Sequence, residues 1–184
     1  MIAALKALDI DGWLTIKEAE VLYSLVVSEK CKTIVELGSW KGRSTSWLMA
    51  AASRVEGTVY AIDHFKGSAE HKASPDLPNL RSDFDANIRR VKMRLGLPDS
   101  CLSVMATDSL LASLHFGDET VDLIFIDASH EYEAVRADLM AWMPKIKQGG
   151  IIAMHDINFD GPKRVFHEFG GICGSIDSLG WWRK

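Results

Sequence analysis

Short apolar runs alternate along the chain with longer segments in which apolar residues recur every three or four positions. The apolar runs span residues 33–38, 58–63, 102–108, 121–127 and 150–156. Runs of this length without polar alternation are typical of strands that are buried on both faces of a parallel sheet. The segments between them have the spacing of amphipathic helices. The pattern therefore predicts an α/β fold in which helices cover both faces of a mostly parallel sheet.

The helix-like segments have recognisable ends. Thr15-Ile-Lys-Glu18 fits a capping box, and the apolar spacing after it predicts a helix to about Glu29, ahead of the sheet. Glycine follows two later helix-like segments, at Gly96 and at Gly149-Gly150, where helices commonly end. The remaining predicted elements are helices near 43–51, 84–95, 135–146 and 162–169, and a final pair of short strands within 172–184.

One segment breaks this rhythm. Residues 64–82 contain Gly67, Pro75 and Pro78 without a sustained period, and the segment is longer than an ordinary connection. We expect it to be a lid or a substrate loop. No shift in composition marks a linker, so residues 1–184 are expected to form one domain that includes an N-terminal helical segment over residues 1–30.

Composition narrows the possible partners. Lysine plus arginine is 21 and aspartate plus glutamate is 25, which gives a formal charge of −4, and no long basic run is present to bind nucleic acid. No apolar stretch reaches membrane-spanning length. Cys31, Cys101 and Cys173 lack metal-site spacing, so we expect reduced thiols in a cytoplasmic protein. A small-molecule partner is expected, and the sequence does not decide whether the chain forms a homo-oligomer.

Several polar residues follow the predicted strands. The carboxyl ends of parallel strands share one edge of a sheet, and ligands bind in the crevice there. Gly38, Asp63, Asp108, Asp127 and Asp156 are all expected at that edge. Any one of these aspartates alone is more commonly a helix cap or a solvated loop residue. Their recurrence after successive strands indicates a ligand site.

The first two strand ends indicate the kind of ligand. Glu36-Leu-Gly-Ser-Trp-Lys-Gly42 places glycines where the backbone must turn sharply beside a ligand. Asp63 ends the second strand, where a carboxylate can accept hydrogen bonds from ribose hydroxyls. Together they predict an adenosine-type ligand. A nicotinamide-dependent oxidoreductase normally shows Gly-x-Gly-x-x-Gly instead, and a non-catalytic binding module with the same fold is a further alternative.

Four segments resemble a known family. Residues 35–45, 60–67, 125–133 and 147–156 look like the class I S-adenosylmethionine-dependent methyltransferases of the "methyltransferase 24" type. That family is similar to cephalosporin hydroxylase-like proteins and to metal-dependent sugar and antibiotic O-methyltransferases. The resemblance implies a Rossmann-like, doubly wound, seven-stranded and mostly parallel sheet whose last strand is antiparallel. It also implies O-methylation of a small hydroxylated metabolite or sugar.

The resemblance implies which residues of this chain form the cofactor site. S-adenosylmethionine is expected to bind at Glu36, Gly38, Ser39, Gly42, Ser44, Asp63, Asp108 and Asp127. Trp40 stands where the wider class often has a further glycine. Trp181 and Trp182 are expected to pack the tail strand against the core rather than to line the site.

A hydroxyl acceptor needs a base or a divalent metal to deprotonate it. Asp127, His130 and His155 are the candidate catalytic residues, and Asp127, His155 and Asp156 are the candidate ligands of a divalent metal such as Mg or Mn. The resemblance implies a three-acid cluster here, but this chain has Ser129 and His155 at two of the expected positions. An imidazole ligand suits later divalent metals, and His130 or His155 would take the acceptor's proton.

Overall fold

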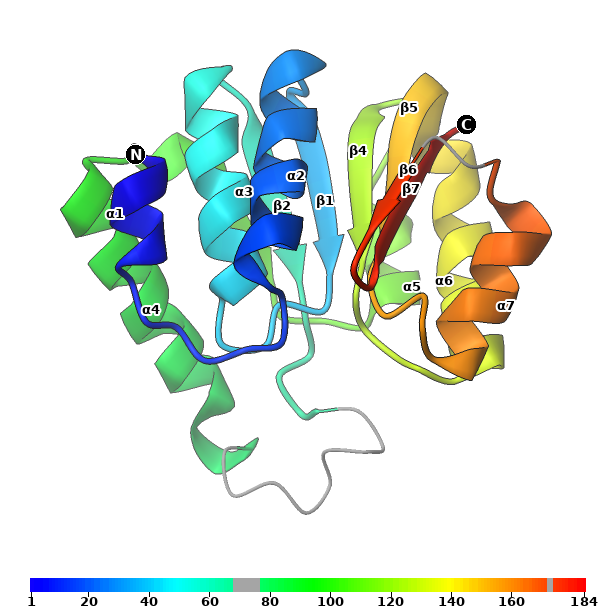
Figure 1. The fold of residues 1–184 in the computed structure, drawn as a ribbon. Helices are drawn as coiled ribbons and strands as arrows, with labels where there is room; N and C mark the ends of the chain where they lie inside the picture. The colour runs from blue at the N-terminus through cyan, green and yellow to red at the C-terminus, as the bar shows by residue number, and fades with distance from the viewer. Residues whose placement is uncertain (68–76, 172–173) are drawn as a thin grey trace.

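A seven-stranded sheet forms the centre of the molecule (Figure 1). The structure is a computed structural model, and it describes residues 1–67, 77–171 and 174–184. The strand order is β3-β2-β1-β4-β5-β7-β6. The strands are β1 (Thr33–Leu37), β2 (Thr58–Ile62), β3 (Leu102–Met105), β4 (Val121–Ile126), β5 (Ile146–Met154), β6 (Gly174–Ile176) and β7 (Leu179–Arg183).

The direction of the strands confirms the predicted fold class. Neighbouring strands from β3 to β5 pair in parallel, whereas β7 pairs antiparallel with both β5 and β6. The sheet is thus the Rossmann-like, mostly parallel arrangement with an antiparallel last strand. The expected pair of short tail strands is present as β6 and β7.

Helices cover both faces of the sheet (Figure 1). They are α1 (Ile2–Lys6), α2 (Ile16–Ser28), α3 (Arg43–Arg54), α4 (Leu80–Leu95), α5 (Ser109–Ser113), α6 (Tyr132–Trp142) and α7 (Asp160–Phe169). Side chains of α2, α3 and α4 belong to one hydrophobic cluster, and those of α5, α6 and α7 belong to the other. Within the described ranges, every helix is too short or too polar to cross a membrane.

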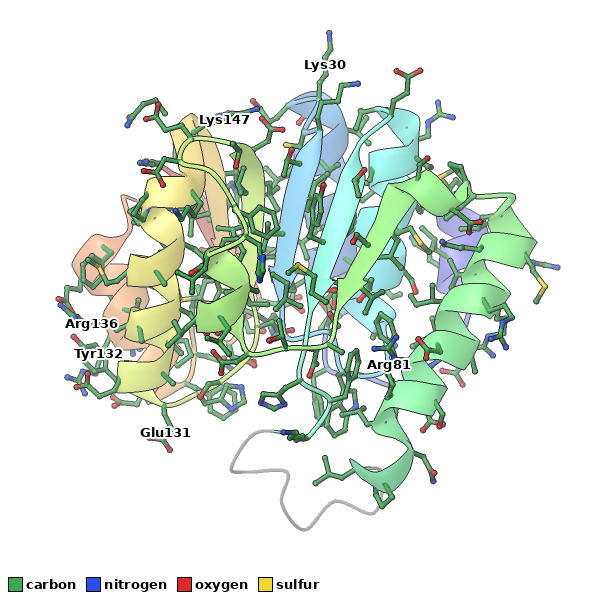
Figure 2. All side chains as sticks on the ribbon, turned by 180° about the vertical axis from the view of Figure 1, so that it is seen from behind. Lys30, Arg81, Glu131, Tyr132, Arg136 and Lys147 are labelled. Carbon is green, nitrogen blue, oxygen red and sulfur yellow. The ribbon has the colours of Figure 1, made fainter. Side chains whose placement is uncertain are left out.

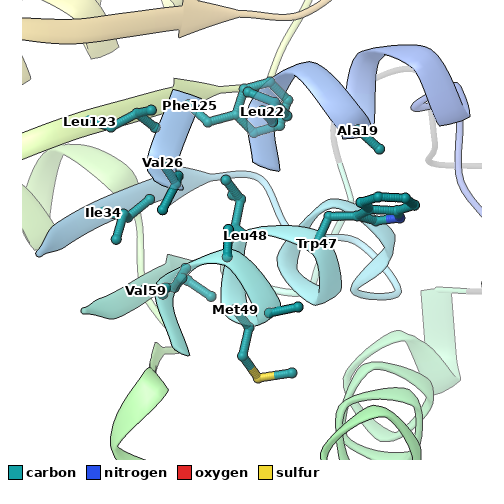
Figure 3. Close-up of a cluster of buried hydrophobic side chains, with 14 of the residues drawn as sticks. Ala19, Leu22, Val26, Ile34, Trp47, Leu48, Met49, Val59, Leu123 and Phe125 are labelled. Atoms are coloured by element: carbon teal, nitrogen blue, oxygen red, sulfur yellow. The ribbon is translucent and has the colours of Figure 1, made fainter. Parts of the chain in front are cut away.

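The alternation of side chains along each strand decides which helices a residue meets. Leu123 and Phe125 of β4 face α2, where Leu22 packs near Phe125 (Figure 3). Ile124, between them, faces the opposite cluster, which includes Trp142 of α6. All of these side chains are fully buried. A residue's position in β4 or β5 therefore fixes which layer of helices it contacts.

The N-terminal capping box is confirmed. The Glu18 backbone N–H donates to Thr15 Oγ1 at 3.3 Å, and the Thr15 backbone N–H donates to Glu18 Oε2 at 2.8 Å. These reciprocal bonds satisfy two N–H groups that a helix start would otherwise leave unpaired. The helix that follows ends at Ser28, one residue before the predicted limit.

One predicted helix boundary is wrong. The helix expected over 135–146 ends at Trp142, and a single turn of 3-10 helix containing Pro144 follows it. Proline has no N–H to continue the helix. Ile146 instead pairs with Val121 and begins β5. Gly149-Gly150 therefore lies inside the strand, and Gly149 adopts a left-handed φ of 75°.

The segment predicted to be a lid is described only in part. Residues 68–76 lie outside the described residues, so the lid stays a prediction. Leu77–Asn79 form a turn of 3-10 helix that leads into α4 at Leu80.

Candidate active site

A cavity of about 880 Å³ opens at the carboxyl-terminal edge of the sheet. In Figure 2 its lining residue Glu131 lies at that edge, and Lys30 and Lys147 lie at the opposite edge. Cavities of roughly 300–1,000 Å³ commonly hold small molecules in proteins. The predicted site residues that line it are Gly38, Ser39, Ser44, Asp63, Asp108, Asp127, His130, His155 and Asp156. Glu36 and Gly42 are not part of this lining.

Asp63 holds the loop between β1 and α3. Its Oδ2 accepts hydrogen bonds from the backbone N–H groups of Ser39 and Trp40, both at 2.9 Å, and its Oδ1 accepts one from Phe65 N–H at 2.6 Å. A carboxylate has about four lone-pair directions, so three of them are used within the protein. Asp63 therefore shapes the loop as well as facing the cavity.

Gly38 permits the close approach of two strand ends. A Cβ atom at this position would lie 2.3 Å from the Asp127 backbone oxygen, and the Gly38 φ of 85° is left-handed. Both constraints exclude a larger residue without movement of the backbone. The loop after β1 is thereby packed directly against the end of β4.

Glu36 lies beneath this loop and is fully buried. Its Oε2 accepts hydrogen bonds from the hydroxyls of Ser39 at 2.8 Å and Thr45 at 2.5 Å. Burial raises the pKa of Glu36 to about 7, although the surrounding hydroxyls lower it. Glu36 thus contacts the residues that shape the loop.

Two further acids lie near the end of β3. Asp108 caps α5, because its Oδ1 accepts a hydrogen bond from Leu110 N–H at 2.9 Å. Asp138 of α6 is buried, lines the cavity and accepts a hydrogen bond from the Ser109 hydroxyl. Burial raises the pKa of Asp138 to about 6. The sequence prediction missed Asp138, although it falls on the same helix face as Val135 and Leu139.

His155 follows β5 directly and is 3% exposed. Its Nδ1 lies 3.1 Å from Asp127 Oδ1, at the end of β4, and 3.2 Å from Asp156 Oδ2. Asp156 adopts a left-handed φ of 57°, a conformation that aspartate tolerates better than most residues. These two adjacent strand ends bring the three candidate metal ligands together, as the sequence predicted.

The other side of the His155 ring faces residues that the sequence prediction missed. Its Nε2 lies 3.1 Å from Ser178 Oγ, in the turn between β6 and β7, and 3.4 Å from Glu18 Oε2. Glu18 was predicted only as a helix cap. No local pattern could reveal this contact, since Glu18 and His155 are 137 positions apart in the chain.

The surrounding carboxylates keep His155 protonated. Burial disfavours the charged imidazole, but hydrogen bonds with Asp127 and Asp156 outweigh it and raise the pKa of His155 to about 11. Burial also raises the pKa of Asp127. For Asp156, burial is outweighed by hydrogen bonds from His130 and His155, which hold its pKa well below the usual range. His155 is therefore poorly suited to accept a proton at neutral pH in this state.

His130 lies on the cavity side of the same cluster. Its Nε2 is 2.7 Å from Asp156 Oδ2, and its ring stacks on Phe159 with centroids 4.6 Å apart. The His130 side chain is 32% exposed, whereas that of His155 is 2% exposed. Both candidate bases line the cavity, and His130 is the more exposed of the two.

The donor atoms of Asp127, His155 and Asp156 fit a divalent ion. One ligand atom from each residue lies within 4.8 Å of the others. Ligands bound at about 2.0–2.2 Å in tetrahedral or octahedral geometry are themselves separated by roughly 3.0–3.5 Å. The distances of 3.1 Å and 3.2 Å from His155 Nδ1 match this separation. One imidazole and two carboxylates suit manganese, iron or zinc better than magnesium.

The tail tryptophans pack as expected. Trp182 is 2% exposed and meets Phe166 of α7 with ring centroids 5.5 Å apart. Neither Trp181 nor Trp182 lines the cavity.

Comparison with known proteins places this geometry in a family. The profile of the family described as "Methyltransferase domain" matches residues 35–157, which is more than half of the chain. The match includes the loop after β1 and the ends of β2, β4 and β5. Among the function classes considered, it therefore supports a methyltransferase over an oxidoreductase or a non-catalytic module.

Solved structures share the fold at low identity. The O-methyltransferase TomG from Streptomyces achromogenes, solved with S-adenosylmethionine, matches with a TM-score of 0.67 and 13% identity over 100% of this chain and 87% of its own. An O-methyltransferase from Bacillus cereus, solved with S-adenosylhomocysteine, gives 0.63 and 19% over 100% and 87%. The TDP-rhamnose 3'-O-methyltransferase CalS11 from calicheamicin biosynthesis gives 0.61 and 17% over 92% and 81%.

The solved structures show that this chain shares their fold, and the match to the family profile shows the family to which the chain belongs. The chain belongs to the methyltransferase-domain family and is an S-adenosylmethionine-dependent methyltransferase.

Proposed function

We propose that the protein methylates a hydroxyl group of a small, neutral acceptor, with help from a divalent metal held by Asp127, His155 and Asp156. The observation that carries the proposal is the position of this cluster. It opens into the same cavity as the loop after β1, at the ends of adjacent strands. A methyl donor on the loop side and an acceptor on the cluster side would meet there.

The cofactor site is proposed on the residues that the resemblance indicates. Ser39, Ser44, Asp63, Asp108 and Asp127 would contact S-adenosylmethionine, with Gly38 allowing close approach. Glu36 and Gly42 would act from behind, by shaping the loop. S-adenosylmethionine supplies a methyl group on a positively charged sulfur, and the acidic lining favours such a ligand. With three lone-pair directions of Asp63 already used, one direction remains for a ribose hydroxyl.

The lining also indicates the charge of the acceptor. Arg43 is the one arginine or lysine among the described lining residues, and it donates to the backbone oxygens of Leu14 and Ile10, both at 2.7 Å. Two of its five N–H donors are therefore engaged with the N-terminal segment. Phosphate groups are commonly bound by arginine and lysine. This supports a neutral hydroxylated metabolite or sugar over a phosphorylated acceptor.

The chain's own residues would align the reactants and take the proton. Asp127 and Asp156 orient the acceptor hydroxyl beside the methyl donor, and this alignment contributes much of the rate in an in-line displacement. His130, which contacts Asp156 through Nε2 and is the more exposed of the two candidate bases, receives the hydroxyl proton. The acceptor oxygen forms a bond to the methyl carbon while the bond from carbon to sulfur breaks. A divalent ion in the cluster would lower the pKa of the acceptor hydroxyl.

The proposal is tested by methyl transfer from isotopically labelled S-adenosylmethionine to a panel of neutral phenols, sugars and aliphatic alcohols, together with phosphorylated forms of the same compounds. Labelled product is expected with Mn²⁺, is expected to disappear in excess chelator, and is expected to return when metal is restored. The surface variant Asp99→Ala should behave as the wild type, because Asp99 is exposed and distant from the cavity. Full turnover in chelator would refute the metal requirement, and labelling of phosphorylated acceptors alone would refute the acceptor class.

A further inference from the structure

Glu18 is placed unusually for the glutamate of a capping box. Such a residue needs only to reach back to the first turn of its own helix. Glu18 is instead 0% exposed, and its Oε1 accepts hydrogen bonds from both the backbone N–H and the hydroxyl of Ser178, each at 2.7 Å. Charged side chains are rarely fully buried without a specific set of partners. The carboxylate thus joins the start of α2 to the turn between β6 and β7.

The hydrogen bonds around Ser178 have a fixed direction. The Ser178 hydroxyl donates its proton to Glu18 Oε1, so the oxygen offers a lone pair to His155 Nε2 at 3.1 Å. Glu18 Oε2, on the same side of the ring at 3.4 Å, is also an acceptor. Both neighbours of Nε2 therefore accept, and Nε2 must carry a proton. The other ring nitrogen, Nδ1, faces the carboxylates of Asp127 and Asp156, so it also carries a proton in the metal-free protein. A bound metal would replace the Nδ1 proton and leave the Nε2 proton in place.

We propose that Glu18, acting through Ser178, is a positioning residue that fixes the proton of His155 on Nε2 and directs Nδ1 toward Asp127 and Asp156. The proposal rests on the metal site of the proposed function, because a directed Nδ1 provides the third donor of that site. Histidines that bind metals commonly donate their other N–H to a carboxylate or a polar group in this way.

The positioning residues come from outside the family match. The profile covers residues 35–157, whereas Glu18 precedes this range and Ser178 follows it. Strand alternation explains why they meet His155. Ile151 and Ala153 of β5 belong to the hydrophobic cluster on the α2 side, and His155 continues that alternation beyond the strand. Leu22 and Val26 anchor α2 on the same face (Figure 3), which leaves Glu18 at the helix start above the ring.

A purely structural role of Glu18 and the proposed positioning role predict different effects of substitutions. If Glu18 only joined two segments, its loss would resemble the loss of any other cap. Thr15→Ala provides that control, because it removes a hydroxyl that accepts from Glu18 N–H and donates to Asp177 in the turn between β6 and β7. The hydrogen bonds of His155 itself do not involve Thr15. Glu18→Gln and Ser178→Ala disturb the acceptors of Nε2 directly. Ser178→Ala keeps the Glu18 carboxylate and its bond to the Ser178 backbone position, so it tests the proposal even if Glu18→Gln does not fold.

The first measurement uses the metal-free protein and nuclear magnetic resonance of imidazole groups labelled with ¹⁵N. The buried His155 Nε2–H should give a downfield proton signal that exchanges slowly with water. We expect this signal in the wild type and in Thr15→Ala, and we expect it to be lost or strongly shifted in Ser178→Ala and Glu18→Gln. An unchanged signal in folded Ser178→Ala would overturn the proposal.

The second measurement is the affinity for Co²⁺, followed by its visible absorption. We expect about a 10- to 100-fold loss of affinity in Ser178→Ala and Glu18→Gln and no loss in Thr15→Ala. Equal affinity in all folded variants would also overturn the proposal. If the wild type itself fails to bind Co²⁺, the metal site of the proposed function is wrong, and the resonance measurement alone decides whether Glu18 positions His155.

Discussion

The buried carboxyl groups on the two sides of the cavity differ in their hydrogen-bond partners and in their pKa values. Beside β1 and β3, Glu36 and Asp138 are hydrogen-bonded by hydroxyl groups, and burial raises their pKa values to about 7 and about 6. Beside β4 and β5, burial raises the pKa of Asp127, but Asp156 contacts two histidines that hold its pKa below the usual range. The first side favours a ligand that brings positive charge, whereas the second already contains positive charge on the His155 imidazole. The comparison supports the proposal that the cofactor binds on the first side and that the proton or metal chemistry takes place on the second.

The largest expected effect comes from disrupting the second side. Asp156→Ala removes one candidate metal ligand and the partner of His130 Nε2. Turnover should fall on the order of 1,000-fold, or about 4 kcal/mol, because a metal ion commonly contributes several kcal/mol to a reaction of this type. Steady-state kinetics with labelled cofactor would measure the loss, and calorimetry should show nearly unchanged cofactor affinity. A variant with normal turnover would remove the β4–β5 cluster from the chemistry.

A smaller effect is expected on the first side. Asp63→Ala removes the acceptor of three backbone N–H groups and any bond to the ribose. Loss of hydrogen bonds to a carboxylate should cost about 2–4 kcal/mol, which weakens S-adenosylmethionine binding by about 30- to 1,000-fold. Calorimetry would measure the cofactor affinity, and Mn²⁺ affinity should stay within about threefold. If both ligands weakened together, the two sides would not be separable.

The smallest effect concerns stability. The pKa of Asp138 in the folded protein is about 6, above the ordinary value of 3.8. The stability that its protonated form contributes is therefore present below about pH 4 and is lost as the pH rises through 6. Asp138→Asn keeps an oxygen for the Ser109 hydroxyl and cannot ionise.

The free energy of unfolding of Asp138→Asn should exceed that of the wild type by about 1–3 kcal/mol at pH 7.5, because the variant avoids a buried charge. This difference in the free energy of unfolding should be smaller by roughly 1 kcal/mol at pH 5. Urea unfolding at both pH values would measure it. An advantage that does not depend on pH would show that ionisation of Asp138 is not its cause.

The sequence could predict what local patterns determine. Apolar runs located the five parallel strands, and the residues at their ends could be assigned to one edge because parallel strands share that edge. The capping box at Thr15 was predicted correctly from four residues. The end of α6 was not, because the glycines at 149–150 resemble a helix end although they lie within β5.

The missing parts of the site depend on contacts between distant positions. Strand alternation could have indicated that His155 faces the α2 side, but not that Glu18 would be the residue above it. Asp63 was predicted as a ribose contact, and its bonds to the loop after β1 became visible only in the folded arrangement. Similarly, the left-handed backbone of Asp156 brings its carboxylate next to His155 Nδ1, and no residue pattern predicted that turn.

The central claim is that Asp127, His155 and Asp156 together hold a divalent metal. The most direct test is pulsed electron paramagnetic resonance of the protein loaded with one equivalent of Mn²⁺. The proposed site predicts modulation from one directly bound imidazole nitrogen, which should change when the histidines carry ¹⁵N and should vanish in His155→Ala. Bound Mn²⁺ without a nitrogen ligand, or no bound Mn²⁺ at all, would contradict the claim.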